Sequence, residues 1–413
     1  MRLAVFTNQF PTRVSTFFAR DIRGLLEAGV EVDIFPFYPV DQSLWRYIPD
    51  TLDERIFPRS KVHHINLTES LRSANFPPLG RLVKYIRDTT VVSVSALRFG
   101  IRPFAKSTYV LLKAWAAAQT LRGNYDHILS YWGNYAATYA YIFHRLTNER
   151  IPFSMFLHAV DLYQDQVYLR QKLLYADNIF VVCDFNRQYI SEHYKDVFER
   201  LSKKIHVYHP GLDLAAFPYE PAGCRSRRVL GVGRFDKCKG FDYLVRATHY
   251  LTRLGLDVEL ELIGDGKEAD RLKALARELS IDKKIRFRGW LQFNEVRDAM
   301  RQASILVHPS SELGDAVPTV IKEAFALGTA VIASKVAGIP ELLDNGKCGI
   351  LVPPRDVKAL ANAMKMLLTD DLARRTYADA ARRYAEEKFD VLRNGQHLAN
   401  ILRSTTRLPL QGN

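Results

Sequence analysis

The sequence of 413 residues has few cysteines and no long apolar run. Its four cysteines (Cys183, Cys224, Cys238 and Cys348) are far apart and show no metal-ligand spacing, so we expect free thiols and no zinc site. No apolar stretch approaches the roughly 18 residues that cross a bilayer. The opening MRLAVFTNQFP lacks the apolar centre and cleavage site of a signal peptide and is typical of a first β-strand. These absences predict a cytoplasmic protein.

Several signatures of catalysis are also missing. The sequence shows no Walker loop, no convincing Ser-His-Asp arrangement and no Asp-x-Asp pair that would hold a metal-bound diphosphate. The absence of paired carboxylates on facing strands disfavours an ordinary glycosidase. We therefore expect neither a bound metal ion nor a cofactor.

Acidic residues are outnumbered, because 58 Lys and Arg stand against 45 Asp and Glu, a formal net charge of +13. A basic surface favours nucleic acid, an anionic membrane or phosphorylated substrates. The cations form no recognisable nucleic-acid-binding module, so no nucleic-acid partner is expected.

The basic excess is concentrated between Arg72 and Arg122, where nine Lys or Arg accompany one acid, Asp88. Cations mixed with aromatic residues are typical of a helix or helix pair at an anionic membrane surface. The alternative is a helical insertion that packs on its own domain and leaves its charges solvated. Both interpretations stay open. The aromatic residues of this segment are Phe76, Tyr85, Phe99, Phe104, Tyr109 and Trp115.

Strands alternate with helices along the chain, which predicts an α/β protein with doubly wound parallel sheets. A polar, irregular stretch at 218–228 suggests a linker between two such units. We expect a first domain at 1–218 with a helical insertion near 72–122, a second domain at 219–385, and a helical segment at 386–413 that crosses back to the first domain.

The most informative segment is Val307–Asn345, VHPSSELGDAVPTVIKEAFALGTAVIASKVAGIPELLDN. It combines two strands with two helix starts, the first of them at Pro318, a residue suited to a first helical turn. Helix starts beside the ends of parallel strands bind anions and nucleotides. Asp315 and Glu323 bracket this helix start, and carboxylates there suit the hydroxyl groups of a sugar or ribose. The segment predicts a nucleotide-sugar site.

A second candidate site is GVGRFDKCKG at 231–240. Gly231 and Gly233 end a strand, Arg234 and Lys239 supply cations, and a helix follows. Glycines, cations and a helix start form a suitable site for a diphosphate. Fixed cations would also stabilise a departing nucleoside diphosphate. The alternative for Arg234 is an ion pair with a neighbouring acid.

Both segments resemble those of family 4 glycosyltransferases, the large retaining group with two Rossmann-like domains (GT-B fold). That family carries Glu-x7-Glu before Ala-x-Ala-x-Gly-x-Pro-Val, and here Asp315-x7-Glu323 precedes AFALGTAV. The resemblance implies that Arg234 and Lys239 hold the donor pyrophosphate and that Glu323 binds the nucleotide. Asp315, one methylene shorter than the family's Glu, would touch the donor sugar. Other implied donor contacts are Gly233, Val317, Pro318 and Thr319.

Two strand ends of the second half match the same family. Gly264 in Gly-Asp-Gly resembles the family's Gly-x-Gly turn near the nucleotide, and Arg288 ends the strand that contacts the base. A packing role for the Arg-Gly-Trp segment is the alternative. In the first half, His158-Ala-Val-Asp161 resembles the His-Gly-x-Asp segment, in which the His approaches the donor sugar.

The loop at 8–17 resembles the acceptor-side loop of polysaccharide-building members and matches it at Thr16 and Phe17. Arg13 in this loop is a candidate for contact with an acceptor phosphate. We assign Arg13, Thr16 and Asp161 to the acceptor side.

The resemblance implies a retaining glycosyltransferase, similar to enzymes of exopolysaccharide and colanic-acid assembly, with its active site in the cleft between the domains. It implies a UDP- or GDP-hexose donor and a glycan or lipid-pyrophosphate-linked acceptor. We expect a peripheral location at the inner face of the plasma membrane. Three alternatives stay open: a nucleotide-sugar epimerase of the same fold, a non-catalytic sugar-nucleotide-binding protein, and a nucleic-acid-binding protein.

Overall fold

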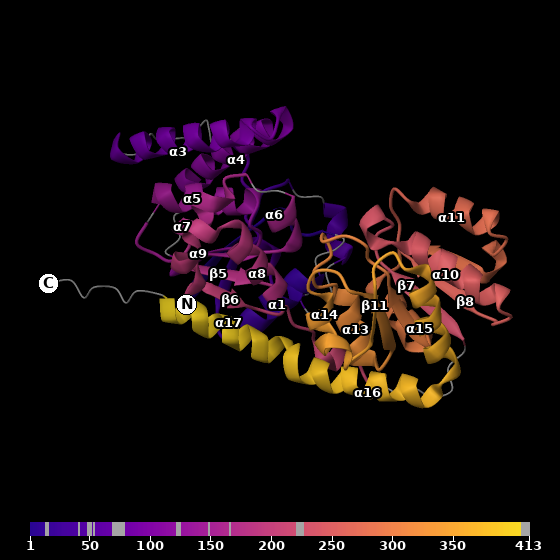
Figure 1. Cartoon of the computed structure of the whole chain (residues 1–413). Helices are drawn as coiled ribbons and strands as arrows, with labels where there is room; N and C mark the ends of the chain where they lie inside the picture. Colours follow the sequence, from indigo (N-terminus) through magenta and orange to yellow (C-terminus); the bar gives the residue numbers. More distant parts are fainter. Residues whose placement is uncertain are drawn as a thin grey trace. The chain divides into compact units, whose positions relative to one another are not determined.

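The computed structural model describes residues 1–12, 16–39, 42–47, 52, 54–67, 79–120, 125–147, 149–164, 167–219 and 227–405. They form two compact units (Figure 1). The first combines Met1–Gly211 with the chain after Asp390, and the second is Leu212–Asp390. Most of the linker expected at 218–228 lies outside the described residues.

The first unit is built on a six-stranded parallel sheet in the order β2-β1-β3-β4-β5-β6. Successive side chains of a strand point to opposite faces, and the central strand follows this rule. Leu3 and Val5 join the core on one face, while Ala4 and Phe6 join the core on the other. The strands are β1 (Arg2–Thr7), β2 (Glu31–Pro36), β3 (His127–Ser130), β4 (Phe153–Leu157), β5 (Asn178–Val181) and β6 (Ile205–Val207).

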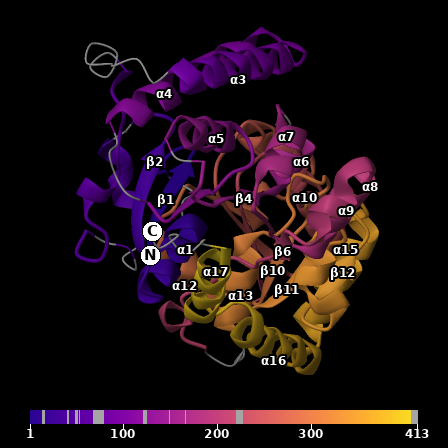
Figure 2. The ribbon, with the colours of Figure 1, turned by 90° about the vertical axis from the view of Figure 1, so that its left-hand side faces the viewer.

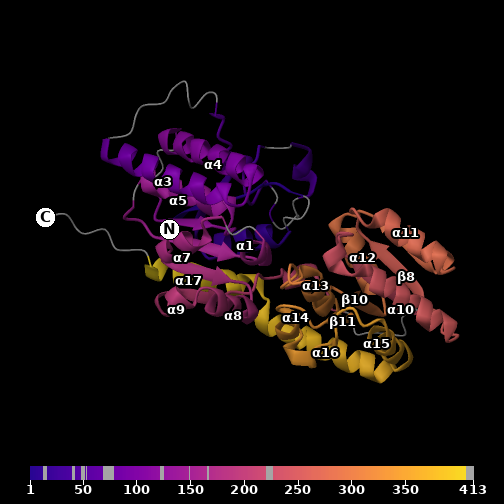
Figure 3. The ribbon, with the colours of Figure 1, turned by 45° about the horizontal axis from the view of Figure 1, so that its top comes forward.

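Helices cover both faces of this sheet. α1 (Thr16–Glu27) and α17 (Val391–Thr405) pack on the Leu3 face, and α5 (Tyr135–Thr147) packs on the Ala4 face. α4 (Ile101–Thr120) and α3 (Leu79–Leu97) pack outside α5, as Figure 3 shows. The shorter helices are α6 (Ala159–Tyr163), α7 (Leu169–Tyr175), α8 (Asp184–His193) and α9 (Lys195–Ser202).

The C-terminal helix α17 returns to α1 at a crossing of two glycines (Figure 1). A Cβ on Gly24 would lie 2.6 Å from the carbonyl oxygen of Val391, and one on Gly395 would lie 2.4 Å from the carbonyl carbon of Gly24. Both distances are shorter than a carbon side chain tolerates. The two helices therefore meet backbone to backbone, which only glycine permits.

The second unit has a parallel six-stranded sheet in the order β12-β11-β10-β7-β8-β9. Val229 and Leu230 of its first strand enter opposite cores. The strands are β7 (Arg228–Val232), β8 (Glu259–Ile263), β9 (Ile285–Gly289), β10 (Ile305–His308), β11 (Ala330–Ser334) and β12 (Ile350–Val352).

The helices of the second unit divide between those two cores. α10 (Phe241–Arg253), α11 (Ala269–Glu278) and α15 (Val357–Thr369) pack on the Val229 side. The Leu230 side carries α12 (Phe293–Gln302), α13 (Thr319–Leu327), α14 (Ile339–Leu342) and α16 (Asp371–Lys388). The prediction of two doubly wound parallel sheets is confirmed.

The structure bears on two expectations from composition, one about the cysteines and one about membrane-spanning helices. Cys183, Cys238 and Cys348 are free thiols, and Cys224 lies outside the described residues. Within the described chain, no helix combines the length and the apolarity that a membrane crossing requires.

Candidate active site

The carboxyl ends of β7 and β10 lie side by side at the point where the second sheet changes direction. β7 has β8 on one side and β10 on the other, so the crossovers leave this point in opposite directions. Ligands of open α/β sheets bind outside the carboxyl ends of the strands at such a switch point. The two candidate segments, 231–240 and Val307–Asn345, both emerge here.

The two segments touch through their backbones. Ser311 donates its backbone N–H to the carbonyl oxygen of Cys238 at 2.8 Å. Gly240 adopts a left-handed φ of 64°, and a Cβ there would lie 2.2 Å from the carbonyl oxygen of Pro309. A glycine is required at this approach for both reasons. The short 3-10 turn Lys237–Lys239 is thereby held against the end of β10.

Asp315 is the centre of a buried polar cluster at this point. Its Oδ2 lies 2.7 Å from Nζ of Lys239 and 2.5 Å from Nε2 of His308. Ser310 also donates its hydroxyl to the same oxygen. His308 and Ser310 are 1% and 0% exposed, and Asp315 is 8% exposed. The cluster therefore joins a cation from the first segment to a carboxylate from the second.

The charges of this cluster follow from its surroundings. Burial alone raises the pKa of Asp315, but the charge of Lys239 and the contact with His308 outweigh burial and hold this pKa well below its ordinary value. Burial lowers the pKa of His308, although Asp315 opposes the shift. Near neutral pH the carboxylate is ionised and the imidazole is neutral, with its Nε2–H donated to Asp315.

Arg234 stands at the end of β7 and is largely accessible. Its Nη2 lies 3.2 Å from Oδ2 of Asp236, and its side chain is 63% exposed. The ion pair anticipated as an alternative is thus present. Because an exposed pair of this kind is weak, it leaves the guanidinium available to a diphosphate.

Gly264 closes the turn after β8 against the end of β7. Its φ is 136°, and a Cβ there would lie 1.9 Å from the carbonyl oxygen of Gly233. Gly233 donates its N–H to Ile263 at 3.0 Å, and Gly264 donates its own to Gly289 at 2.9 Å. These glycines bring three strand ends into register. The predicted contact of Gly233 and Gly264 with the donor remains a prediction.

The helix start after β10 is arranged to receive an anion. Pro318, expected to open the helix, is its N-cap residue, and Thr319 is the first helical residue. The first turn of α13 contains no acidic side chain. N–H groups of a first turn have no partner within the helix and favour negative charge. Val317 packs on the core just before it, and Glu323 lies one turn further on, 9% exposed.

Arg288 has a structural partner. Its Nη1 lies 2.7 Å from Oε1 of Glu261, a residue of β8 that is 2% exposed. Arg228 approaches the same carboxylate at 3.8 Å. Arg288 thus compensates a buried charge, and its contact with a nucleotide base remains a prediction.

In the first unit, His158 sits at the carboxyl end of β4 in an aromatic setting. Its Nε2 donates to the carbonyl oxygen of Tyr131 at 3.1 Å. The ring centres of His158 and Trp132 lie 4.4 Å apart. The side chain of Asp161 accepts the backbone N–H of His158 at 2.9 Å. Asp161 is fully buried, so it positions His158 at the start of α6.

The acceptor-side prediction is only partly described by the structure. Thr16 is the first residue of α1, and the next residue, Phe17, has its ring centre 5.6 Å from that of His158. The structure therefore brings the matched end of the 8–17 loop to His158. Arg13 lies outside the described residues.

Sequence reasoning missed two residues of the second-unit cluster, His308 and Ser310. Both follow the apolar run of β10 directly, and polar residues at the carboxyl end of a parallel strand are the signal that could have identified them. It also missed Lys172, whose buried Nζ donates to the carbonyl oxygens of Gly133 and Asn134 at 2.7 and 2.9 Å and so fixes the loop after β3.

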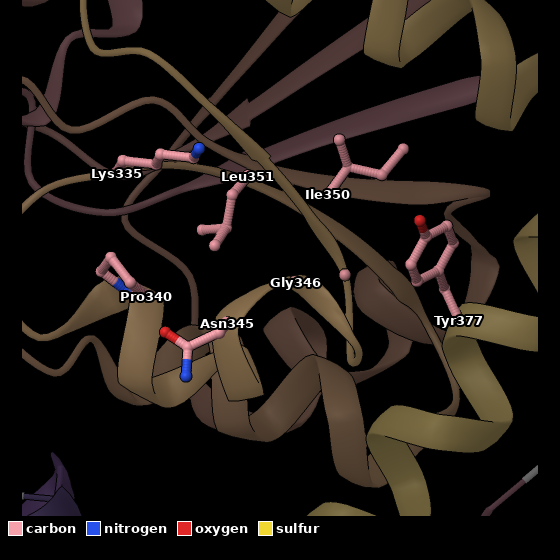
Figure 4. A pocket seen from close by; sticks show the side chains of 8 residues that line it. Lys335, Pro340, Asn345, Gly346, Ile350, Leu351 and Tyr377 are labelled. Carbon is pink, nitrogen blue, oxygen red and sulfur yellow. The ribbon is translucent and has the colours of Figure 1, made fainter.

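A cavity of about 480 Å³ lies elsewhere in the second unit, at the β12 edge of the sheet (Figure 4). Lys335, Asn345 and Tyr377 are among its lining residues. None of the predicted site residues lines it. Within the described residues, no group of three His, Cys, Asp or Glu side chains is placed to hold a metal ion.

Residues 223–384 match the family described as Glycosyl transferases group 1. This part of the chain is a group 1 glycosyltransferase domain. The match contains the whole cluster around Asp315, together with Arg234 and Glu323. The predicted resemblance is thereby confirmed for the second unit.

Two relatives extend the similarity over the full length of the chain. One is the putative colanic acid biosynthesis glycosyltransferase WcaL of Escherichia coli K12, at 24% identity over 98% of this chain and 100% of the relative. The other is the amylovoran biosynthesis glycosyltransferase AmsK of Erwinia amylovora, at 25% identity over 97% and 99%.

Solved structures agree on the fold. HepE of Anabaena, solved with UDP and glucose, matches with a TM-score of 0.70 and 19% identity over 98% of this chain and 100% of that chain. Sucrose-phosphate synthase of Thermosynechococcus elongatus matches with a TM-score of 0.69 and 20% identity, over 98% of each chain. The predicted GT-B fold, with two Rossmann-like units, is confirmed.

Proposed function

We propose that this glycosyltransferase moves a hexose from a UDP- or GDP-sugar to a glycan or lipid-pyrophosphate-linked acceptor in polysaccharide biosynthesis, with retention of configuration. The observation that carries the proposal is the meeting of Arg234, Lys239 and the α13 start at one switch point. A diphosphate needs such a set of positive groups, and a sugar needs nearby carboxylates.

Each of these residues has its own role in binding the donor. Arg234, 63% exposed, binds the diphosphate from solvent, while Lys239 is held in place by Asp315. The N–H groups at the start of α13 bind the same anion. Glu323, one turn into the helix, accepts hydroxyl groups of the donor. UDP-glucose is bound by HepE, a protein of the same fold, and this supports a nucleotide-sugar donor here.

Arg234 and Lys239 serve the reaction as well as binding. The acceptor hydroxyl attacks the anomeric carbon on the face from which the diphosphate departs. The bond from carbon to the diphosphate oxygen breaks as the new glycosidic bond forms, and a phosphate oxygen takes the hydroxyl proton. Negative charge grows on the leaving diphosphate, so fixed cations beside it stabilise the transition state without a divalent metal.

The acceptor assignment is supported by the relatives. WcaL and AmsK are named for colanic acid and amylovoran biosynthesis and cover almost all of this chain. We extend that assignment to a growing polysaccharide as the acceptor. His158 contacts the transferred sugar, as the family resemblance implies, and the acceptor is received on the side of Thr16.

The test is donor binding measured by calorimetry with a panel of UDP- and GDP-hexoses in the presence of a metal chelator. Wild-type protein is expected to bind one donor selectively. Arg234→Ala and Glu323→Ala should each weaken that binding by about tenfold or more, since hydrogen bonds to charged groups contribute about 1.5–3 kcal/mol.

Arg271→Ala is the matched control for Arg234→Ala. Arg271 is also 63% exposed and also forms an ion pair, with Glu268 at 2.8 Å, but it lies on α11 outside the candidate site. Full donor binding by Arg234→Ala, or an equal loss in Arg271→Ala, would contradict the site. A product that forms without any acceptor would replace the proposal with an epimerase.

A further inference from the structure

Helices α3 and α4 lie outermost in the first unit (Figure 2). They expose an unusual amount of apolar surface. Ten of the eighteen large hydrophobic side chains that are exposed in the described chain belong to residues 79–112. Contiguous exposed apolar surface on a folded protein marks an interaction site. This hairpin is therefore the strongest candidate for a docking surface in the described structure.

Helix α3 has two apolar stripes on opposite sides. Val92 and Ala96 face inward and are fully buried. Residues two positions apart in a helix are separated by about 200° around its axis. Val94 therefore points away from Val92. The members of the outer stripe are three, four or eight residues apart, and each of these spacings returns to the same face of a helix. It consists of Leu79, Val83, Ile86, Val94 and Leu97, all exposed.

The inner side of α3 is already held by specific contacts. Asp88, 4% exposed, pairs with Arg145 of α5. Tyr85 donates its hydroxyl to the carbonyl oxygen of Leu111 in α4 at 3.2 Å, and Arg81 donates to Leu146 at 3.2 Å. The hairpin is thus packed on its own unit through one face, and the outer stripe has no part in that packing.

The charge of the exposed surface has one sign. Residues 79–112 contain a single acid, Asp88, and it is buried in its ion pair. The exposed side chains of this segment include six cations and no carboxylate. They are Arg81, Lys84, Arg87, Arg98, Arg102 and Lys106. Two of them already contact their own unit, since Arg81 donates to Leu146 and Lys84 lies 3.0 Å from Glu149.

We infer that the outer face of the α3–α4 hairpin binds an anionic lipid surface. Its apolar stripe enters the boundary between headgroups and acyl chains, and its cations meet the phosphates, the arrangement of an interfacial amphipathic helix. A second copy of the chain fits this face poorly, because a two-fold contact places the same patch on both partners. The exposed cations of one copy would then oppose those of the other.

The hairpin is oriented toward the functional edge of its own sheet. Tyr109 of α4 packs on Phe37, which follows β2, and Nζ of Lys106 lies 5.5 Å from the ring centre of Tyr135, which follows β3. Phe37 and Tyr135 thus lie near the carboxyl ends of their strands. This is the same edge of the sheet at which β4 ends, directly before His158. A lipid surface bound by the hairpin therefore lies on the acceptor-side edge of the first unit.

The experiment is flotation of the full-length protein with vesicles of phosphatidylcholine alone and of phosphatidylcholine with phosphatidylglycerol in equal amounts. We expect binding to the anionic vesicles at low salt, partial loss as salt screens the charges, and little binding to the neutral vesicles. Donor binding is measured on the same samples, so that failure of the lipid surface and failure of the proposed function are read separately.

Two pairs of variants with matched controls locate the surface. Leu97→Gln with Ile101→Gln removes side chains that are 56% and 80% exposed, and Leu254→Gln with Leu372→Gln removes two of 57% and 77% in the second unit. Arg98→Glu with Arg102→Glu reverses two hairpin charges, and Lys358→Glu with Lys365→Glu makes the same change on α15. Each hairpin pair should weaken vesicle binding by about tenfold or more, and each control pair should not.

Three results would overturn the inference. The first is that both hairpin double variants bind anionic vesicles as strongly as the wild type does. The second is that the control double variants lose as much vesicle binding as the hairpin variants. The third is a wild-type dimer that the hairpin substitutions convert to a monomer, since the face would then bind a second copy. Unchanged circular dichroism and unchanged donor binding are required of every variant that is scored.

Discussion

Lys239 Nζ lies 2.7 Å from Oδ2 of Asp315, and the same oxygen accepts from His308 and Ser310. The carboxylate that the family resemblance assigns to the donor sugar is therefore bonded to the cation assigned to the donor pyrophosphate. An Asp, one methylene shorter than the family's Glu, is held close to the end of β10. In this structure its first effect is to position Lys239.

Asp315→Asn is expected to destabilise the protein by about 3 kcal/mol, because it leaves the cation of Lys239 without its buried partner. The pKa of Asp315 is depressed, so its contribution is complete above the unfolded carboxyl pKa of about 3.9 and is lost as pH falls toward the folded value. Urea unfolding should thus show a large difference between wild type and variant at pH 7 that shrinks as the pH falls below about 4.

Asp257→Asn is the control, because Asp257 also pairs with a lysine, Lys284 at 2.5 Å, but both side chains are exposed. Its free energy of unfolding should stay close to wild type. A small effect of Asp315→Asn at pH 7, similar to that of the control, would show that the buried pair does not form in solution.

Asp161 offers a test of positioning at His158. Asp161→Ala removes the acceptor for the backbone N–H of His158, and loss of such a cap costs about 1 kcal/mol. We expect a large fall in kcat with little change in donor affinity. Asp161→Asn keeps an oxygen at this place, so it should recover most of the activity.

His158→Ala gives the reference for this pair, since it removes the ring itself. Transfer rates and donor binding are measured for all three variants. If Asp161→Asn proves as inactive as Asp161→Ala, the charge of Asp161 acts directly and the positioning role is wrong. If His158→Ala keeps full activity, the predicted sugar contact is wrong as well.

The strands were predictable because most are buried apolar runs bounded by turn residues. AVIAS, which forms β11 and is buried at all five positions, is an example. Helix α5 gave no comparable signal. Its sequence YAATYAYIFHRLT is buried at nearly every position, so it lacks the polar face whose period identifies a surface helix.

The candidate site was predictable where it is built from residues that lie close together in the sequence. Strand-end glycines, nearby cations and a helix start are all visible in sequence, and the structure brings them to one switch point. The partner of Arg288 could not be read in the same way. Glu261 pairs in register with Arg286, and Arg288 reaches it diagonally beside an irregularity between Leu262 and Ile263. That contact depends on strand register, which only the fold determines.

Lys113 shows how a basic segment can hide a buried charge. It belongs to α4, is 1% exposed, and donates to the carbonyl oxygens of Pro36, at 3.0 Å, and Phe37. Burial lowers the pKa of this lysine to about 8. The lysine fixes the end of β2 to the hairpin helix, but carrying a buried proton costs stability at neutral pH.

The consequence is a stability that rises with pH above about 8, since the unfolded chain then binds more protons at this lysine, whose unfolded pKa is about 10.4. Lys113→Met lacks this rise. The difference in unfolding free energy, wild type minus variant, should grow by about 3 kcal/mol between pH 8 and 10.5 in urea titrations.

The neighbours of Lys113 leave that window clear. Burial lowers the pKa of His64 to about 4 and raises the pKa of Tyr139 far above its ordinary value, so neither titrates between pH 8 and 10.5. Lys106→Met, an exposed lysine of the same helix, is the control and should show no such growth. A constant difference for Lys113→Met across this range would mean that the lysine is solvated and that the contact between α4 and the end of β2 is not maintained in solution.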